Sequence, residues 1–406
     1  MAADEGFKVV RLGARGDGIA EAEAGPRYLP FALPGERVRP GGTGLPELLS
    51  APSPQRRAAR CRHFGLCGGC VAQHMAEPLY AEWKRGIVED ALRKRGLNLE
   101  LAPLRPMAAA SRRRAVLTGR CVEGASLLGY HPRDSDAVFA VLECPVLVPE
   151  IVAALPALRA IVAATGQREV RLTVLATPVG LDVAVATSRG LDAKVSARLA
   201  QIGAAEPRLA RLSLDGECLS QRAPPTLSFA GVEVCPPPAA FVQAVAEAES
   251  AIAEEVAAAT AKVRRAADLF CGLGTLSFAL ARRAAVAAYD SDAAALEALQ
   301  LGARHAKGLK PIEAKVRDLM REPLSARELD AFDAVVFDPP RAGAMAQAGA
   351  LARSRVAVVV AVSCHPGTLA RDLRILVDGG YRLERVVPID QFLFSGHVEA
   401  VATLRR

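Results

Sequence analysis

The fold is decided by the stretch Ala267-Asp268-Leu269-Phe270-Cys271-Gly272-Leu273-Gly274-Thr275. An apolar run reaches an aspartate, and a glycine turn then leads into a helical pattern, as at a strand-to-helix turn of an open α/β sheet. Two further apolar runs end in the same way, one before Phe337-Asp338-Pro339-Pro340-Arg341 and one before Ser363-Cys364-His365-Pro366. Because ligands bind outside the carboxyl ends of parallel strands, we expect the polar side chains at these ends to form one site.

A regular alternation of strand-like and helix-like segments surrounds these turns from residue 241 onward. Helical stretches are expected at 292–307 and 367–378. The strand-like runs are 266–270, 284–289, 312–316, 332–337, 356–363, 381–388 and 398–404. This pattern predicts an α/β fold with a doubly wound, Rossmann-like sheet.

The chain of 406 residues is long enough for two or three domains. Residues 1–52 are rich in Gly and Pro between short β-like pieces, which is typical of a small β-barrel of oligonucleotide-binding type. Residues 53–240 form a mixed α+β segment with a helix expected at 80–95. We therefore expect three domains, at 1–52, 53–240 and 241–406.

The charge of the chain is moderately basic, with a formal net value of +7. Clustered arginines in the first third favour a polyanionic partner, because Lys and Arg neutralise phosphates, although solvated surface charge is the simpler alternative. The clusters are Arg56, Arg57, Arg60 and Arg62, then residues 93–95, and then residues 112–114. Composition does not separate RNA from DNA.

The location of the protein is also suggested by what its composition lacks. No apolar run approaches the roughly 20 residues that a membrane-spanning helix needs. The first residues, MAADE, do not have the basic and apolar pattern of a signal peptide. We expect a soluble, cytoplasmic protein.

The spacing of the cysteines indicates a metal site in the central segment. Of the nine cysteines, three follow a Cys-x5-Cys-x2-Cys pattern within residues 61–70, and a fourth in Glu143-Cys144-Pro145 is best placed to complete the set. The expected ligands are Cys61, Cys67, Cys70 and Cys144. Four thiolates serve zinc and a four-iron four-sulfur cluster equally well, and in the zinc case His63 and His74 are alternative ligands.

Four acids lie at or near the ends of successive expected strands: Asp268, Asp290, Asp318 and Asp338. Ser277 stands where a dinucleotide fingerprint has its third glycine, so NAD is disfavoured. An acid at the end of the second strand suits a ligand with ribose hydroxyls but no pyrophosphate, such as S-adenosylmethionine. Asp290 would accept from the ribose, and Asp318 would lie near the adenine. The alternative is that these acids only cap helices.

At this point the chain resembles the RNA uridine-5-methyltransferase family, class I S-adenosylmethionine enzymes that make 5-methyluridine. The matching elements are Leu33-Pro34-Gly35-Glu36, residues 61–70, Glu143-Cys144-Pro145, Phe241-Val242-Gln243, residues 268–274, residues 338–341, residues 363–366 and His397-Val398-Glu399. The resemblance implies that the cofactor is held by Gln243, Phe270, Thr275, Asp290, Asp318 and Asp338. It also implies a four-iron four-sulfur cluster on the four cysteines, a TRAM-like first domain, and a monomer acting on RNA, most plausibly 23S ribosomal RNA or a precursor particle.

The chemistry of uracil methylation explains why three of these residues are required. Uracil C5 is a weak nucleophile, so a thiolate must first add at C6, and Cys364 is expected to supply it. We expect the N-terminus of the following helix to lower the pKa of this thiol. Glu399 is the expected base that removes the C5 proton. Asp338 would accept from uracil N3–H and repel the lone pair that cytosine presents there.

Three other functions compete with this interpretation. Cytosine-5 methylation is disfavoured by Asp338. A transfer-RNA uridine methyltransferase would resemble the catalytic domain, but the transfer-RNA members lack the cysteine set. A metal-stabilised RNA-binding protein of ribosome assembly, with an inactive methyltransferase domain, would not need Cys364 and Glu399.

Overall fold

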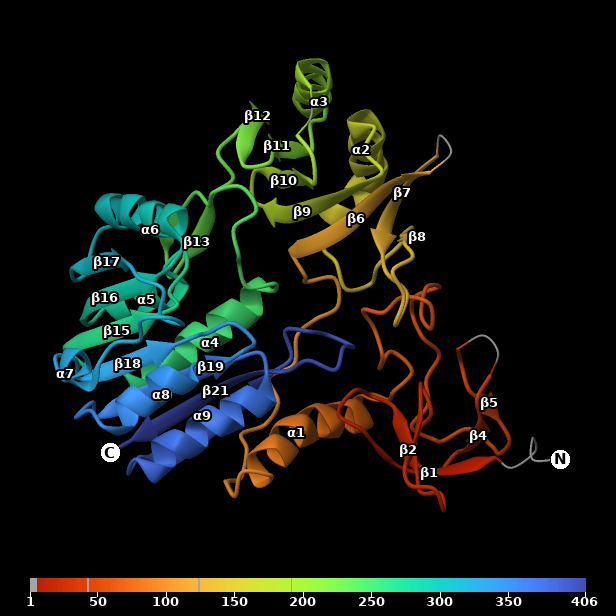
Figure 1. The fold of residues 1–406 in the computed structure, drawn as a ribbon, viewed down its shortest axis with the longest axis horizontal. Helices are drawn as coiled ribbons and strands as arrows, with labels where there is room; N and C mark the ends of the chain where they lie inside the picture. Colours follow the sequence, from red (N-terminus) through yellow and green to blue (C-terminus); the bar gives the residue numbers. More distant parts are fainter. Residues whose placement is uncertain (1–5, 42–43, 123–124, 191) are drawn as a thin grey trace.

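The computed structural model describes residues 6–41, 44–122, 125–190 and 192–406. Figure 1 shows three regions: a large α/β body that contains the C-terminus, a central sheet above it, and a small N-terminal sheet at the far side. In the described part of the chain, no helix is long and apolar enough to cross a membrane.

The C-terminal sheet has seven strands, and all seven expected strands are confirmed to within two residues at each end. They are β15 (Arg265–Leu269), β16 (Ala285–Asp290), β17 (Ile312–Val316), β18 (Ala334–Phe337), β19 (Val358–Ser363), β20 (Arg382–Ile389) and β21 (Glu399–Arg405). Their order is β17-β16-β15-β18-β19-β21-β20, and only β21 runs antiparallel to its neighbours. The strand order reverses between β15 and β18, which opens a crevice at their carboxyl ends.

Helices cover both faces of this sheet, and alternate residues of β19 pack into the two hydrophobic cores on either side. Val360 and Val362 pack into one hydrophobic core, whereas Val359 and Ala361 pack into the other. The covering helices are α4 (Ala246–Ala259), α5 (Thr275–Ala281), α6 (Ala293–His305), α7 (Ala326–Leu329), α8 (Met345–Ala352) and α9 (Pro366–Asp378). A strand buried on both sides reads as a continuous apolar run, which is why Val356 to Val362 carries no polar residue.

The central region contains a second seven-stranded sheet, in the order β12-β11-β10-β9-β6-β7-β8. Its strands are β6 (Arg114–Val122), β7 (Ala125–Tyr130), β8 (Phe139–Ala140), β9 (Glu169–Thr177), β10 (Gly180–Thr187), β11 (Leu209–Leu214) and β12 (Glu217–Gln221). Helices α2 (Pro149–Thr165) and α3 (Ala193–Ala205) pack on it, and a short hairpin, β13 (Leu227–Phe229) with β14 (Val232–Val234), leads to the C-terminal sheet.

The helix expected at 80–95 is α1 (Glu77–Arg93), and it packs away from the central sheet. It lies against α9, and its Val88 and Leu92 belong to a hydrophobic core of the C-terminal sheet. A segment from the first quarter of the sequence therefore stabilises the α/β body.

The N-terminal region is a five-stranded antiparallel sheet in the order β3-β2-β1-β4-β5. Its strands are β1 (Phe7–Leu12), β2 (Gly18–Ala20), β3 (Arg27–Leu29), β4 (Arg37–Arg39) and β5 (Glu47–Leu48). Among the described residues β3 and β5 are its edges, so the expected barrel is an open sheet. Its small core includes Val9, Leu29 and Val38.

Candidate active site

A cavity of about 580 Å³ lies at the carboxyl ends of β15, β16, β18 and β19. It brings together the residues predicted for catalysis and for cofactor binding. They are Gln243, Phe270, Thr275, Asp290, Asp318, Asp338, Cys364 and Glu399. Residues that are up to 156 positions apart in the sequence therefore share one site.

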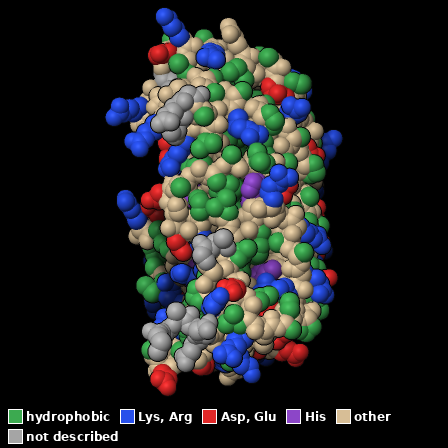
Figure 2. Space-filling model, turned by 90° about the vertical axis from the view of Figure 1, so that its right-hand side faces the viewer, with side chains coloured by type: hydrophobic (Ala, Val, Ile, Leu, Met, Phe, Trp, Pro, Cys, Tyr) green, Lys and Arg blue, Asp and Glu red, His purple; other side chains and the backbone are tan. Residues whose placement is uncertain are grey.

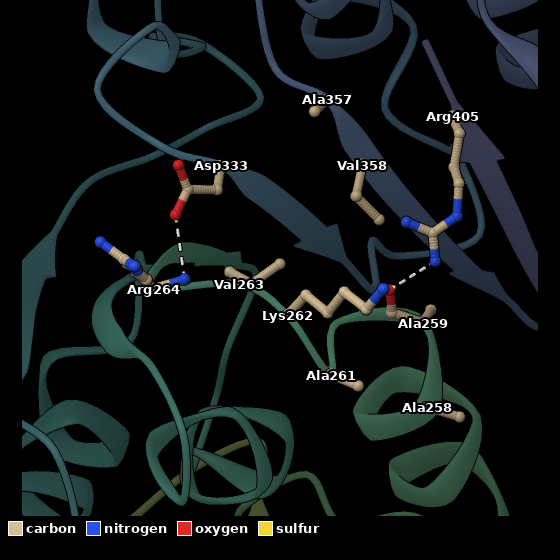
Figure 3. A pocket seen from close by; sticks show the side chains of 10 residues that line it. All are labelled: Ala258, Ala259, Ala261, Lys262, Val263, Arg264, Asp333, Ala357, Val358 and Arg405. Carbon is tan, nitrogen blue, oxygen red and sulfur yellow. Dashed lines mark hydrogen bonds between the residues drawn. The ribbon is translucent and has the colours of Figure 1, made fainter.

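A second hollow, of about 610 Å³, lies at the opposite end of the sheet, and Figure 3 shows it. It is bounded by the end of α4 and the starts of β15 and β19. Its polar groups are used within the protein: Arg264 N donates to Asp333 Oδ2, and Arg405 Nη2 donates to the carbonyl of Ala259. It contains none of the predicted site residues.

The floor of the first cavity is held by the glycine turn after β15. Phe270 has a φ of +62°, a left-handed conformation that is costly for a bulky residue, and Gly274 has a φ of +85°. A Cβ on Gly274 would lie 2.6 Å from side-chain atoms of Leu299, so the turn requires glycine there. Ser277 is buried and its Oγ donates to Asp268 Oδ2 at 2.6 Å. Ser277, which stands where a dinucleotide fingerprint has its third glycine, therefore holds the buried Asp268 in place.

Asp290 and Asp318 both hold turns at the mouth of the crevice. Asp290 accepts from Gly272 N at 2.8 Å and from Asp292 N at 2.9 Å. Asp318 accepts from Met320 N at 3.0 Å. Neither is a helix N-cap, because α6 is capped by Asp292 and α7 by Ser325. The capping alternative thus does not account for these two acids.

The pairing of β19 with β21 places Cys364 and Glu399 next to each other. Ser363 is the register partner of Ala400, and the next residues outward on the two strands are Cys364 and Glu399. The antiparallel insertion of β21 therefore places the expected base beside the expected nucleophile. Glu399 is buried, whereas Cys364 is partly exposed in the cavity.

The thiol of Cys364 differs from the expectation. Burial, together with the negative charges of Glu399 and Asp338, raises its pKa to about 11. Pro366 does begin α9, but the predicted lowering of the pKa by the helix N-terminus is wrong, because the pKa is raised. Desolvation and two neighbouring carboxylates outweigh the partial charge of a helix end.

Two glutamine side chains connect the carboxyl groups of the site. Gln391 Nε2 donates to Glu399 Oε2 at 2.6 Å and to Gln243 Oε1 at 2.7 Å. Gln243 Nε2 in turn donates to Asp338 Oδ2 at 2.9 Å. Burial raises the pKa of Glu399 well above its ordinary value, Asp338 raises it further, and burial also raises the pKa of Asp338.

The four cysteines predicted as metal ligands line one small cavity, together with His63. Among the described residues, no group of three or more His, Cys, Asp or Glu side chains is arranged to hold a metal ion. Of the alternative ligands, His63 Nε2 accepts from Leu142 N at 3.1 Å, and His74 packs against Phe31 and Phe64 outside the lining of the cavity. Burial raises the pKa of Cys70 to about 12, and the other three thiols add to this.

The arginine clusters are only partly free for a polyanion. Arg113 is committed to the buried Glu249, at 2.7 Å, and Arg56 binds the fully buried Glu36. Arg112 and Arg114 line the cavity that contains Cys364, where the guanidinium of Arg114 lies over the ring of Phe241. The prediction of a polyanion partner rests on the arginines that remain.

Sequence reasoning missed Gln391, because a glutamine beside an aspartate has no spacing signal. It also missed Glu249, whose pKa burial raises to about 7 and which lines the cavity from α4. Only the helical position of Glu249 on the face toward the sheet could have indicated its burial.

The fold and the site define a class of protein. The chain has the α/β fold of S-adenosylmethionine-dependent methyltransferases. It matches the crystal structure of the Pyrococcus abyssi tRNA (uracil-54, C5)-methyltransferase in complex with S-adenosyl-L-homocysteine, with a TM-score of 0.74 and 21% identity over 98% of this chain and 100% of that one.

Sequence comparisons identify the family. A family model described as tRNA (uracil-5-)-methyltransferase matches residues 236–406. An uncharacterized RNA methyltransferase of Rhizobium meliloti is 47% identical over 98% of both chains. The 23S rRNA (uracil(1939)-C(5))-methyltransferase RlmD of Chromohalobacter salexigens is 34% identical over 99% of this chain and 89% of that one. The chain belongs to the RNA (uracil-5-)-methyltransferase family, and S-adenosylmethionine is its methyl donor.

Proposed function

We propose that this enzyme methylates C5 of a uridine in 23S ribosomal RNA through a covalent bond between Cys364 and uracil C6. The observation that carries the mechanism is the shared cavity, in which Cys364 follows β19, Glu399 begins the adjacent β21, and Asp338 acts on both electrostatically. The ribosomal substrate is supported by the similarity to RlmD, which extends over nearly the whole of this chain.

The cofactor-binding residues divide the cavity into two parts. Phe270 and Thr275 lie at the glycine turn, and Asp290 and Asp318 lie farther along the crevice, after β16 and β17. We assign the ribose to Asp290, the adenine to Asp318, and the methionine end to Gln243 and the glycine turn. The bound cofactor supplies an electrophilic methyl group on a sulfonium.

The reaction then proceeds through the remaining residues. Asp338 accepts from uracil N3–H, the Cys364 thiolate forms a bond to C6, and the electron pair of the C5–C6 double bond takes the methyl group at C5. Glu399 then removes the C5 proton. The C–H electron pair restores the double bond and expels the thiolate from C6.

The raised pKa of Cys364 supports a nucleophile whose thiolate is favoured by the bound substrates. Two carboxylates disfavour the thiolate in the free protein. A positive sulfonium in the same cavity offsets their charge, and uracil N3–H neutralises part of that of Asp338. We therefore place activation of the nucleophile after binding of both substrates.

The test is methyl transfer to defined RNAs with the purified enzyme. A 23S ribosomal RNA transcript should accept the methyl group at C5, and a transcript containing 5-fluorouridine should remain covalently attached, because the base cannot remove fluorine as it removes a proton. Transfer to transfer RNA alone would overturn the ribosomal assignment. Turnover without an attached 5-fluorouridine RNA would overturn the covalent mechanism.

We also propose that Cys61, Cys67, Cys70 and Cys144 hold a four-iron four-sulfur cluster. The chemistry of the donor set supports it, because four thiols line one cavity and Gly69 N donates to Cys67 Sγ at 3.5 Å, a contact suited to a sulfur that carries negative charge. Methyl transfer needs no electrons, so we assign the cluster a structural role. Anaerobically purified protein should contain about four irons and be brown. One equivalent of zinc, or no metal, would overturn this assignment.

A further inference from the structure

Gln391 is a buried side chain whose hydrogen-bonding groups are all engaged. Its side chain is 2% exposed, within the loop that joins β20 to β21. Its Nε2 contacts Glu399 and Gln243, and its Oε1 accepts from Ala244 N at 3.2 Å. It connects the loop before the catalytic base to the segment before α4, 148 residues away in the sequence.

The direction of these hydrogen bonds is set by a single backbone group. Ala244 N–H can only donate, so it must face Gln391 Oε1. Both N–H bonds of the Gln391 amide then point to Glu399 Oε2 and Gln243 Oε1. Gln243 therefore turns its own Nε2 toward Asp338. Both carboxyl groups of the site thus receive an N–H donor.

The two carboxyl oxygens of Glu399 therefore have different hydrogen-bonding surroundings. Oε2 accepts from Gln391, whereas Oε1 is buried and has no hydrogen-bond partner among the described residues. An N–H donor at one oxygen stabilises the ionised carboxylate, and the other oxygen stays available for a proton. This arrangement suits a group that must accept a proton from a bound substrate.

We propose that Gln391 is a positioning residue, which holds Glu399 as a base with Oε1 open to the C5 proton and links it through Gln243 to Asp338. The inference deepens the proposed function and rests on it. Without the Nε2 donor, the pKa of Glu399 would rise further, because the hydrogen bond from Gln391 lowers it. Methyl transfer would then proceed, and elimination of the thiolate would be slow.

The other titratable groups that face this arrangement come from four elements. Asp338 follows β18 and Cys364 follows β19, and both act on Glu399 or are acted on by it. His397 precedes β21 and lines the same cavity. Asp390, beside Gln391, is paired with Lys84 of α1 at 2.7 Å. Gln391 bonds directly to Glu399 and reaches Asp338 through Gln243, so the effect of a change at Gln391 falls first on Glu399.

The experiment measures decay of the covalent protein–RNA adduct in a single turnover between pH 6 and pH 9. Gln391→Leu removes the donor, and adduct decay at pH 7 should slow by about tenfold or more and recover as the pH rises. Formation of the adduct at saturating S-adenosylmethionine should change little. Gln391→Glu keeps the shape but can donate only when protonated, so its adduct decay should become slower, not faster, as the pH rises.

The matched control is Gln347→Leu. Gln347 is another buried glutamine, bonded through both ends of its amide to the backbone of Leu324, far from the cavity lining. It should lower thermal stability without altering the pH profile. A profile parallel to wild type in both Gln391 variants would overturn the inference. Normal turnover by Glu399→Gln with no adduct would overturn the proposed function as well. The Gln391 variants therefore test the positioning role, and the Glu399 variant tests the mechanism on which it rests.

Discussion

Lys84 and Asp390 form an ion pair that is buried from solvent on both sides, with 2.7 Å between Nζ and Oδ1. Lys84 Nζ also donates to the carbonyls of Phe392 and His397, so one ammonium group organises the loop that leads to Glu399. Tyr80 Oη donates to Asp390 Oδ2 at 2.6 Å. Glu399, the proposed base, is therefore held in place by a helix that lies about 300 residues earlier in the sequence.

Replacing Lys84 by methionine should destabilise the protein by about 3–5 kcal/mol, because Asp390 would remain buried without its counter-charge. Burial lowers the pKa of Lys84 and raises that of Asp390, so each depends on the other to stay ionised. Denaturant unfolding measures the loss. The double variant Lys84→Met with Asp390→Asn should recover part of the lost stability. If the double variant loses as much stability as Lys84→Met alone, the two residues are not coupled.

Cys364→Ala should reduce turnover by at least about a hundredfold while leaving affinity for S-adenosylmethionine nearly unchanged, because the thiolate acts on the base and not on the cofactor. Calorimetry gives the affinity, and methyl incorporation into RNA gives the rate. Cys121→Ala is the matched control, since Cys121 is a partly buried thiol of β6 in the central sheet, outside the lining of the cavity. Substantial activity in Cys364→Ala would remove it from the role of nucleophile.

Alkylation of Cys364 by iodoacetamide should be slow at pH 8, because its pKa of about 11 leaves the thiol protonated. Glu399→Gln removes a negative charge that raises this pKa, so alkylation at pH 8 should become faster. Peptide mass spectrometry of the modified residue measures both rates. The opposite order would show that the carboxylate does not act on the thiol.

Asp268→Asn should flatten the pH dependence of stability. Burial raises the pKa of Asp268 to about 7 from 3.8, so the folded state binds its proton more tightly than the unfolded state, and stability falls as the pH rises through this window. Between pH 5.5 and 7.5 this group alone accounts for about 2 kcal/mol. His74 has a lowered pKa and acts in the opposite direction, so the difference between variant and wild type is the quantity to measure.

Charge reversal at Lys8 and Arg11 should weaken RNA binding and reduce its salt dependence by about one per lost phosphate contact, with little change in cofactor affinity. Both side chains are exposed on β1. Figure 2 shows Lys and Arg side chains distributed over the face that includes the N-terminal sheet.

The two substitutions on β1 are cleaner than removal of residues 1–52, which would also remove Glu36, the partner of Arg56. Lys262→Glu, in the hollow of Figure 3, is the control. An unchanged salt slope would exclude this sheet from the RNA site.

Much of the C-terminal fold and the membership of the site could be predicted from the sequence, because both depend on local patterns. Apolar runs such as 312–316 and 356–363 mark strands, and a parallel sheet brings the carboxyl ends of its strands to one edge. Asp290 and Asp338 were therefore predictable as neighbours of the same crevice. The cysteine spacing in residues 61–70 predicted a metal site; these thiols do line one small cavity, but no group of the described residues is arranged to hold a metal ion.

Only the tertiary structure decided the contacts that set the chemistry of the site. The pKa of Cys364 was predicted from its own helix, but it is governed by burial and by carboxylates from β21 and from the end of β18. The Gln391–Gln243 bond and the Lys84–Asp390 pair join segments that have no local relation in the sequence. Desolvation and hydrogen bonding depend on which groups meet inside the fold, and no pattern within a few residues of Glu399 encodes that meeting.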